Sequence, residues 1–194
     1  VTLSAVGDTI IEPNKTVVID INTVSNGTEK DGFQQQTVTI LDDDLPTVFW
    51  TASSQISPSE SGTMVVTAQL SAASGFSVTV PFVVTGSAAS SSDYTITPSP
   101  IVILAGGSMG SATITIATDT LDEPTETVVL DMVSVTNATK LGTQTHTATI
   151  TDDDGPPMVF WSVDSQVSAE EKGTMSVVAQ LSAASGFDVT VPFT

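Results

Sequence analysis

Apolar and polar residues alternate over short stretches along most of this chain. In its middle part, period-2 patterns or β-branched runs predict strands at residues 47–53, 63–70, 78–84, 101–105, 112–117, 127–135 and 145–151. Turn signals such as Ser74-Gly75, Gly106-Gly107 and Gly142 separate these stretches. Seven short strands without a helical stretch predict an all-β fold, a two-sheet antiparallel sandwich.

The pattern recurs at a fixed step of 111 residues. Residues 46–82 and 157–193 align without a gap and are identical at 26 of 37 positions, and residues 7–20 align with 118–131 at the same step. A period of this length is a whole domain rather than one turn of a solenoid. We therefore predict three segments in tandem, which are the C-terminal half of one repeat (1–45), a complete repeat (46–155) and the N-terminal half of the next (156–194).

The two half repeats predict an array larger than one sandwich. Each half would expose apolar faces and unpaired strand edges if nothing covered them. Either the missing strands belong to a longer version of the same chain, or halves of separate chains complete each other head-to-tail. We expect an extended, filamentous assembly in both cases. The segment has no apolar run of membrane-spanning length, so we expect no membrane insertion here.

Charge changes the range of plausible partners. The chain has 22 Asp and Glu against four Lys and no Arg, which gives a net charge of −18. Nucleic acids and anionic membranes need cationic patches, so neither is an expected partner. The chain has no cysteine, and therefore no disulfide can stabilise it. No nucleophile and base stand at catalytic spacing, so we expect no enzymatic activity.

The acids of the complete repeat gather just outside the predicted strands. They stand before the 63–70 strand, between the 112–117 and 127–135 strands, and after the 145–151 strand. Alternate strand ends of a sandwich meet at one pole, so we expect these acids to converge. Two carboxylates about 4 Å apart repel by roughly 4 kcal/mol at an effective dielectric of about 20. With almost no Lys or Arg to pair with, the cluster needs a cation from solution.

The donor set indicates which cation this is. Carboxylates and carbonyls, with no Cys and a single His, suit calcium before magnesium and exclude zinc and copper. The competing interpretation is that acidic loops only keep the protein soluble. Recurrence favours the metal, because Asp-Asp-Asp occurs at 42–44 and 152–154 and Asp-Thr-x-x-Glu-Pro at 8–13 and 119–124. The EF-hand pattern is absent, so the site is not a helix–loop–helix.

These motifs resemble those of the Calx-beta domain family. The resemblance lies in Glu60-x-Gly62, in Ser92-Asp93-Tyr94, in the acidic run 119–126 and in the closing run 149–154, and it extends to both half copies. It implies a seven-stranded immunoglobulin-like sandwich that binds several calcium ions at one pole, beside the junction with the next domain. The ligands that it implies in the complete repeat are Glu60, Asp93, Asp119, the Leu121 carbonyl, Glu123, Glu126, Asp152, Asp153 and Asp154.

The neighbouring copies depart from this set. In the preceding copy, Lys15 stands at the position of Glu126 and Ile11 at the position of Asp122, so fewer or weaker calcium sites are expected there. The candidate ligands outside the complete repeat are Asp8, Glu12, Asp42, Asp43 and Asp44 in the preceding copy and Glu171, with Glu170 beside it, in the following copy.

Three other side chains are weaker candidates for a functional role. His146 lies within a predicted strand, with no partner at catalytic spacing, and we expect an ordinary strand residue. Trp50 and Trp161 each end a Val-Phe-Trp run at the start of a copy. A core or interdomain contact is expected for them rather than a sugar-stacking surface.

Three classes of function are compatible with the sequence. The leading hypothesis is a calcium-binding structural repeat of an extracellular or cell-surface stalk, adhesin or filament. In this hypothesis, calcium bound at the acidic ends near the domain junctions rigidifies the array, and duplication of near-identical copies lengthens a spacer. The alternative is a regulatory calcium-sensor module of a membrane-associated protein. A hydrolase with appended repeats is third, since no nucleophile and base stand at catalytic spacing in these repeats. The expected partners are calcium ions and neighbouring repeats, in the same chain or by head-to-tail self-assembly.

Overall fold

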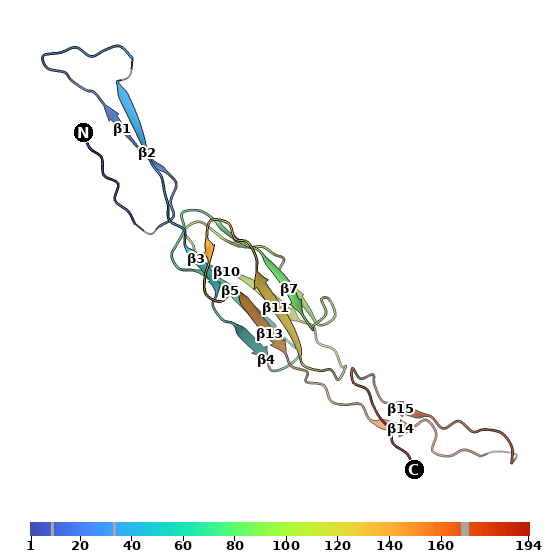
Figure 1. Ribbon diagram of the computed structural model, residues 1–194. Helices are drawn as coiled ribbons and strands as arrows, with labels where there is room; N and C mark the ends of the chain where they lie inside the picture. Colours follow the sequence, from blue (N-terminus) through green and yellow to red (C-terminus); the bar gives the residue numbers. More distant parts are fainter. Residues whose placement is uncertain (9, 33, 168–170) are drawn as a thin grey trace.

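A computed structural model describes residues 1–8, 10–32, 34–167 and 171–194 (Figure 1). In the described residues, regular secondary structure consists of strands alone, so the predicted all-β class is confirmed. The chain forms an extended row, with a hairpin towards the N-terminus, a sandwich in the middle and a second hairpin towards the C-terminus (Figure 1).

The sandwich is built by eleven strands. In chain order they are β3 (Thr47–Trp50), β4 (Ser54–Ser57), β5 (Thr63–Leu70), β6 (Val78–Val80), β7 (Phe82–Gly86), β8 (Tyr94–Ile96), β9 (Ile101–Ile103), β10 (Met109–Ile116), β11 (Glu126–Met132), β12 (Thr139–Lys140) and β13 (Thr145–Ile150). One sheet has the order β12-β3-β5-β10-β8 and the other β4-β13-β11-β7, while β6 and β9 pair separately.

Alternation along the strands produces the core. On β5, for example, Met64, Val66, Ala68 and Leu70 are buried, whereas Thr63 and Val65 face solvent. Successive side chains of a strand point to opposite faces of its sheet, so each sheet presents one apolar face to the other. The fully buried side chains of the core come from both sheets and include Val48, Trp50, Val66, Ile114, Val128 and Leu130.

The predicted strand over 47–53 is in fact shorter and is followed by a strand of the other sheet. β3 pairs with β12 and β4 pairs with β13, and both of these pairs are parallel. The chain bends between Trp50 and Ser54 and so passes from one sheet to the other. The other strand pairings of the sandwich are antiparallel, so the predicted antiparallel sandwich departs from that pattern at these two edges alone.

Two more strand predictions needed correction. The stretch 78–84 is divided into β6 and β7 at Pro81, which has no N–H to donate to a ladder. β8 was not predicted, because its short alternating run directly follows a Ser-rich turn, and the buried ring of Tyr94 fixes it to the core.

The hairpins on either side repeat parts of the sandwich. The N-terminal hairpin pairs β1 (Lys15–Asp20) with β2 (Gln35–Ile40). β1 corresponds to β11 at the 111-residue step, and β2 corresponds to β13 one residue short of that step, because Lys15 pairs with Ile40 as Glu126 pairs with Ile150. The C-terminal hairpin pairs β14 (Val159–Trp161) with β15 (Ala179–Leu181) and corresponds to β3 and β5. Trp50 is 1% exposed, whereas its counterpart Trp161 is 48% exposed, because only the sandwich has strands that cover the indole.

Trp50 and Trp161 give a matched test of this packing. The Trp50 ring meets Phe82 edge-on with centroids 6.3 Å apart, and its Nε1–H donates to the Gln144 carbonyl at 2.8 Å. Trp50→Ala should lower the free energy of unfolding by about 3–5 kcal/mol through the cavity and the lost hydrogen bond. Trp161→Ala should cost about 1 kcal/mol or less. Urea denaturation followed by circular dichroism measures both, and equal losses would contradict this assignment of the core.

Candidate metal centre

Acidic side chains from four connections meet at one end of the sandwich. The connections are β4–β5, β7–β8, β10–β11 and the segment that follows β13. β4 and β13 run parallel, so both end at this pole, and the chain turns there from β10 into β11. We call the following eight residues the acidic pole: Glu60, Asp93, Asp119, Glu123, Glu126, Asp152, Asp153 and Asp154.

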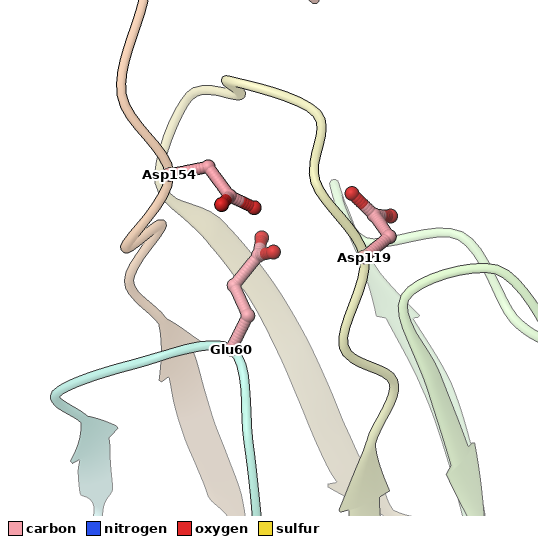
Figure 2. A group of neighbouring side chains, drawn as sticks. All are labelled: Glu60, Asp119 and Asp154. Carbon is pink, nitrogen blue, oxygen red and sulfur yellow. The ribbon is translucent and has the colours of Figure 1, made fainter.

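The first cluster within the acidic pole joins Glu60, Asp119 and Asp154. Each offers one carboxylate oxygen, and these oxygens lie within 4.8 Å of one another. Figure 2 shows the carboxylates of Glu60 and Asp154 turned towards each other, with Asp119 across the gap on a different loop. Three sequence-distant connections therefore bring hard oxygen donors to one point, which suits a cation that takes many oxygen ligands.

The second cluster joins Asp93, Glu123 and Glu126. Their donor oxygens also lie within 4.8 Å of one another, and all three side chains are half-buried. Glu126 is the first residue of β11, Glu123 precedes it in the loop, and Asp93 immediately precedes β8. The acidic pole thus contains two groups of three donors, and both involve the loop between β10 and β11.

Hydrogen bonds fix the loops that carry the first cluster. The Glu60 N–H donates to Asp153 Oδ1 at 3.2 Å, and Thr118 Oγ1 donates to the Glu60 carbonyl at 2.8 Å. The Leu121 N–H donates to Asp119 Oδ1 at 2.7 Å, which is the short turn that an Asp side chain makes with its own backbone. Asp153 therefore positions Glu60 with one of its oxygens.

Two carboxylate oxygens at the acidic pole are buried without a partner. Glu60 is only 7% exposed, and its Oε2 accepts no hydrogen bond. Asp152 Oδ1 is likewise buried and unpartnered. Burying a carboxylate oxygen without a hydrogen bond or counter-ion is unfavourable, and such groups are normally paired or bound to metal. In the described residues, the one ion pair joins Lys15 and Glu12, so no side-chain cation is paired with this pole.

The electrostatics of the acidic pole show the same deficit of positive charge. Burial, helped by the charges of Asp152 and Asp119, raises the pKa of Glu60 to about 7. Burial and the hydrogen bond with Asp93 raise the pKa of Glu126 to about 7. Burial also raises the pKa of Glu123, to which the charge of Asp119 adds. Without a metal ion, protons are the available means of relieving this repulsion.

Asp93 and Asp154 complete the electrostatic description. Burial alone would raise the pKa of Asp93, but hydrogen bonds from the Ala89 N–H, from Ser92 and from Glu126 outweigh it and lower the pKa. For Asp154, desolvation raises the pKa first, and the charges of Asp152 and Asp153 add to it. Hydrogen bonding thus favours the ionised form of Asp93, and the same contact with Asp93 raises the pKa of Glu126.

The preceding copy has a different arrangement. Its candidate ligands line one pocket at the end of the N-terminal hairpin, together with Lys15, and are Asp8, Glu12, Asp42, Asp43 and Asp44. Lys15 pairs with Glu12, and this contact, together with the charges of Asp8 and Asp42, raises the pKa of Lys15. No cluster of three acids occurs in the described part of this copy.

The remaining sequence candidates lie apart from the acidic pole. Glu171 is exposed and joins no cluster in the described residues, and Glu170 lies outside them. His146 is buried, with Nδ1 2.8 Å from the Ala52 carbonyl oxygen. Sequence reasoning did not find the role of Asp122, whose Oδ2 accepts a hydrogen bond from Ser185 of the next copy at 3.2 Å. The unchanged Ser-Ala-Ala-Ser-Gly-Phe of both copies was the available signal.

Comparison with known proteins identifies the fold. No protein-family model and no curated protein matches this sequence. The structure is similar to the apo-form Calx CBD1 domain, with a TM-score of 0.51 and 14% identity over 57% of this chain and 100% of that domain. It is also similar to CBD12 from CALX1.2, with a TM-score of 0.51 and 14% identity over 56% of this chain and 46% of that one.

A third similar structure is the calcium binding domain CBD12 of CALX1.1, with a TM-score of 0.50 and 17% identity over 55% of this chain and 44% of that one. The matches thus span less than half of each CBD12 chain. At these identities the likeness concerns the fold, and the Calx-beta fold that the motifs indicated is confirmed. None of the described residues belongs to a helix long and apolar enough to cross a membrane.

The raised pKa values predict how the metal-free protein responds to pH. Glu60 and Glu126 hold their protons to a pH of about 7 in the folded chain, against a reference pKa of 4.5. Between these values the folded state binds more protons than the unfolded state. The free energy of unfolding in a chelator should therefore fall as the pH rises from about 4.5 to 7, and then level off. Melting temperatures across this range measure the effect.

Glu60→Gln tests which group is responsible. The amide removes the buried charge, so the melting temperature in chelator should rise above that of the parent at a pH of about 8, and the pH dependence should weaken. Glu29→Gln makes the same change of charge at an exposed site of the N-terminal hairpin and should do neither. Metal-free stability that increases with pH in this range would contradict the assignment.

Proposed function

We propose that this chain is a section of a calcium-binding structural array, part of an extracellular or cell-surface stalk, adhesin or filament. The observation that carries the proposal is the acidic pole, where Glu60 Oε2 and Asp152 Oδ1 are buried and unpartnered among convergent carboxylates. Calcium supplies the missing positive charge. It accepts six to eight oxygen ligands in flexible geometry, whereas magnesium demands a near-ideal octahedron of six.

The two clusters are the calcium sites of this proposal. Glu60, Asp119 and Asp154 hold one ion, and Asp152 lies close enough to Glu60 to raise its pKa. Asp93, Glu123 and Glu126 hold another ion. The name of one similar structure describes a calcium binding domain, which supports this choice of ion. Calcium replaces the protons that the acidic pole otherwise needs, so binding releases protons.

The structural role rests on the arrangement of the copies. Similar sequences recur at a step of 111 residues, and the bodies they form lie in an extended row (Figure 1). An extracellular module meets calcium at millimolar concentration and needs an affinity of only about 10⁻⁴–10⁻³ M. We further propose that the repeats have no enzymatic activity and serve as spacers. A dissociation constant below about 10⁻⁶ M would instead favour the alternative, a calcium-sensor module of a membrane-associated protein.

Calcium should stabilise the fold. Binding to the folded state alone adds about 2.7 kcal/mol per site when free calcium is a hundredfold above the dissociation constant. Millimolar calcium should therefore raise the melting temperature clearly, and an excess of chelator should reverse the rise. Magnesium at the same concentration should have a smaller effect. Superimposable melting curves with calcium and with chelator would refute calcium binding at the acidic pole.

Single substitutions should separate the two clusters. Asp119→Asn and Glu126→Gln each remove one ligand charge from a different cluster, so each should lower the calcium stoichiometry or the affinity of one site. Asp131→Asn is the control, because Asp131 lies on β11 away from the acidic pole and accepts a hydrogen bond from Thr145 Oγ1 at 2.6 Å. Isothermal titration calorimetry measures all three. Equal losses in all three variants would mean that calcium binds diffusely rather than at these clusters.

A further inference from the structure

The N-terminal hairpin and the sandwich meet through a short backbone contact. The Gly75 N–H donates to the Ile11 carbonyl at 2.6 Å. Ile11 and Ser74 form an isolated parallel β-bridge at the same place. Ile11 is 4% exposed although it lies in a loop, which shows how closely the two bodies fit there.

The sandwich and the C-terminal hairpin meet through the same contact. The Gly186 N–H donates to the Asp122 carbonyl at 2.8 Å, and Asp122 and Ser185 form an isolated parallel bridge. All three residues are displaced by 111 positions from their counterparts at the first junction. Two junctions with one geometry show that the contact belongs to the repeat and is not an accident of one pair of copies.

Glycine is needed in this contact because the two backbones approach closely. A Cβ added to Gly75 would lie 2.5 Å from the Ile11 carbonyl oxygen, and one added to Gly186 would lie 3.1 Å from the Asp122 carbonyl oxygen. The first distance requires the backbones to separate, and the second is tight. The segment around this glycine, Leu-Ser-Ala-Ala-Ser-Gly-Phe, is identical in residues 70–76 and 181–187.

The two junctions differ in the side chain at the centre of the loop. At the first junction, the buried Ile11 adds no charge, and Lys15 pairs with Glu12 in the same loop. At the second junction, Asp122 accepts a hydrogen bond from Ser185, and its charge contributes to the raised pKa of Asp154. The first loop is thus paired with a cation, Lys15 at the start of β1, whereas the second loop has none paired with it in the described part of the chain.

We propose that the Ser-Gly turn at 74–75 and 185–186 is the dock at which each repeat receives the acidic loop of the repeat before it. We further propose that the residue at position 11 or 122 decides whether the dock depends on metal. The Ile11 dock closes without a metal ion, and the Asp122 dock closes only when calcium holds the acidic pole. The calcium dependence of the Asp122 dock rests on the proposed function, whereas the existence of the dock does not.

The physical reason is the position of Asp122 between the two clusters. Asp119 of the first cluster and Glu123 of the second lie on the same loop as Asp122. Without a cation, the carboxylates repel one another and the loop has no single favoured position. Calcium draws both parts of the loop inward, and the Asp122 carbonyl then stays where the Gly186 N–H can reach it.

Distances between spin labels in the whole chain test the proposal. The chain has no cysteine, so two introduced cysteines label one junction at a time. Thr37 on β2 with Ser111 on β10 spans the first junction, and Ser111 with Gln180 on β15 spans the second, all at exposed positions. In chelator, the distance distribution should be narrow across the first junction and broad across the second. Calcium should remove the broad component at the second junction alone.

Variants separate the dock from the metal. Gly186→Val should broaden the distance distribution across the second junction even with calcium bound, while the calcium stoichiometry in calorimetry stays unchanged. Ala184→Val is the control, because Ala184 is an exposed residue of the same turn, and it should leave the distribution narrow. In chelator, Asp122→Ile should narrow the distance distribution across the second junction, and Ile11→Asp should broaden the distribution across the first.

Three outcomes would overturn parts of the proposal. A narrow distance distribution across the second junction of the Gly186→Val variant would overturn the assignment of the Ser-Gly turn as the dock. If calcium binds and changes the distance distributions across both junctions equally, the proposed role of position 11 or 122 is overturned. Absence of calcium binding in calorimetry would refute the proposed function and the metal dependence, and would leave the dock to be judged by the glycine variants alone.

Discussion

Repulsion among carboxylates that have no cation nearby is the constraint on which the functional part of this structure depends. The strands contribute a core that needs nothing from solution, since both sheets bury their apolar faces against each other. The connections at one end differ, because their acidic side chains converge there and leave oxygens of Glu60 and Asp152 buried without a partner. The core is thus stabilised by its own side chains, whereas the acidic pole carries a carboxylate repulsion that no side-chain cation of the described residues relieves.

The path of the chain explains why these particular acids meet. After β3, the chain changes sheets, and β4 then runs parallel to β13. Parallel neighbours end at the same side, so the residues that follow both strands are brought together, and the Glu60 N–H meets the Asp153 carboxylate. A wholly antiparallel arrangement of these two strands would have placed Glu60 and Asp153 at opposite ends of the sheet.

Much of this could be predicted from the sequence, and the exceptions have physical causes. Alternation located the long strands, such as β5 and β10, because their burial is strictly two-fold. It did not show the change of sheet after Trp50, since a strand that changes sheets keeps its local pattern. It also missed β8, whose alternation is only three residues long and follows a Ser-rich turn. The acids were found from composition and recurrence, but the contact between Asp122 and Ser185 depends on how two copies meet, which no local pattern encodes.

The contact between copies has a direction, with the acidic loop at one end of a repeat and the Ser-Gly turn at the other. Such a head-to-tail contact does not close on itself unless its rotation happens to. A duplication or deletion of any whole number of 111-residue periods therefore leaves every loop facing a turn. Recombination between similar copies can change the length of such a protein in one genetic event without creating a new interface. Its reach is then a heritable variable that selection can adjust in steps of one repeat.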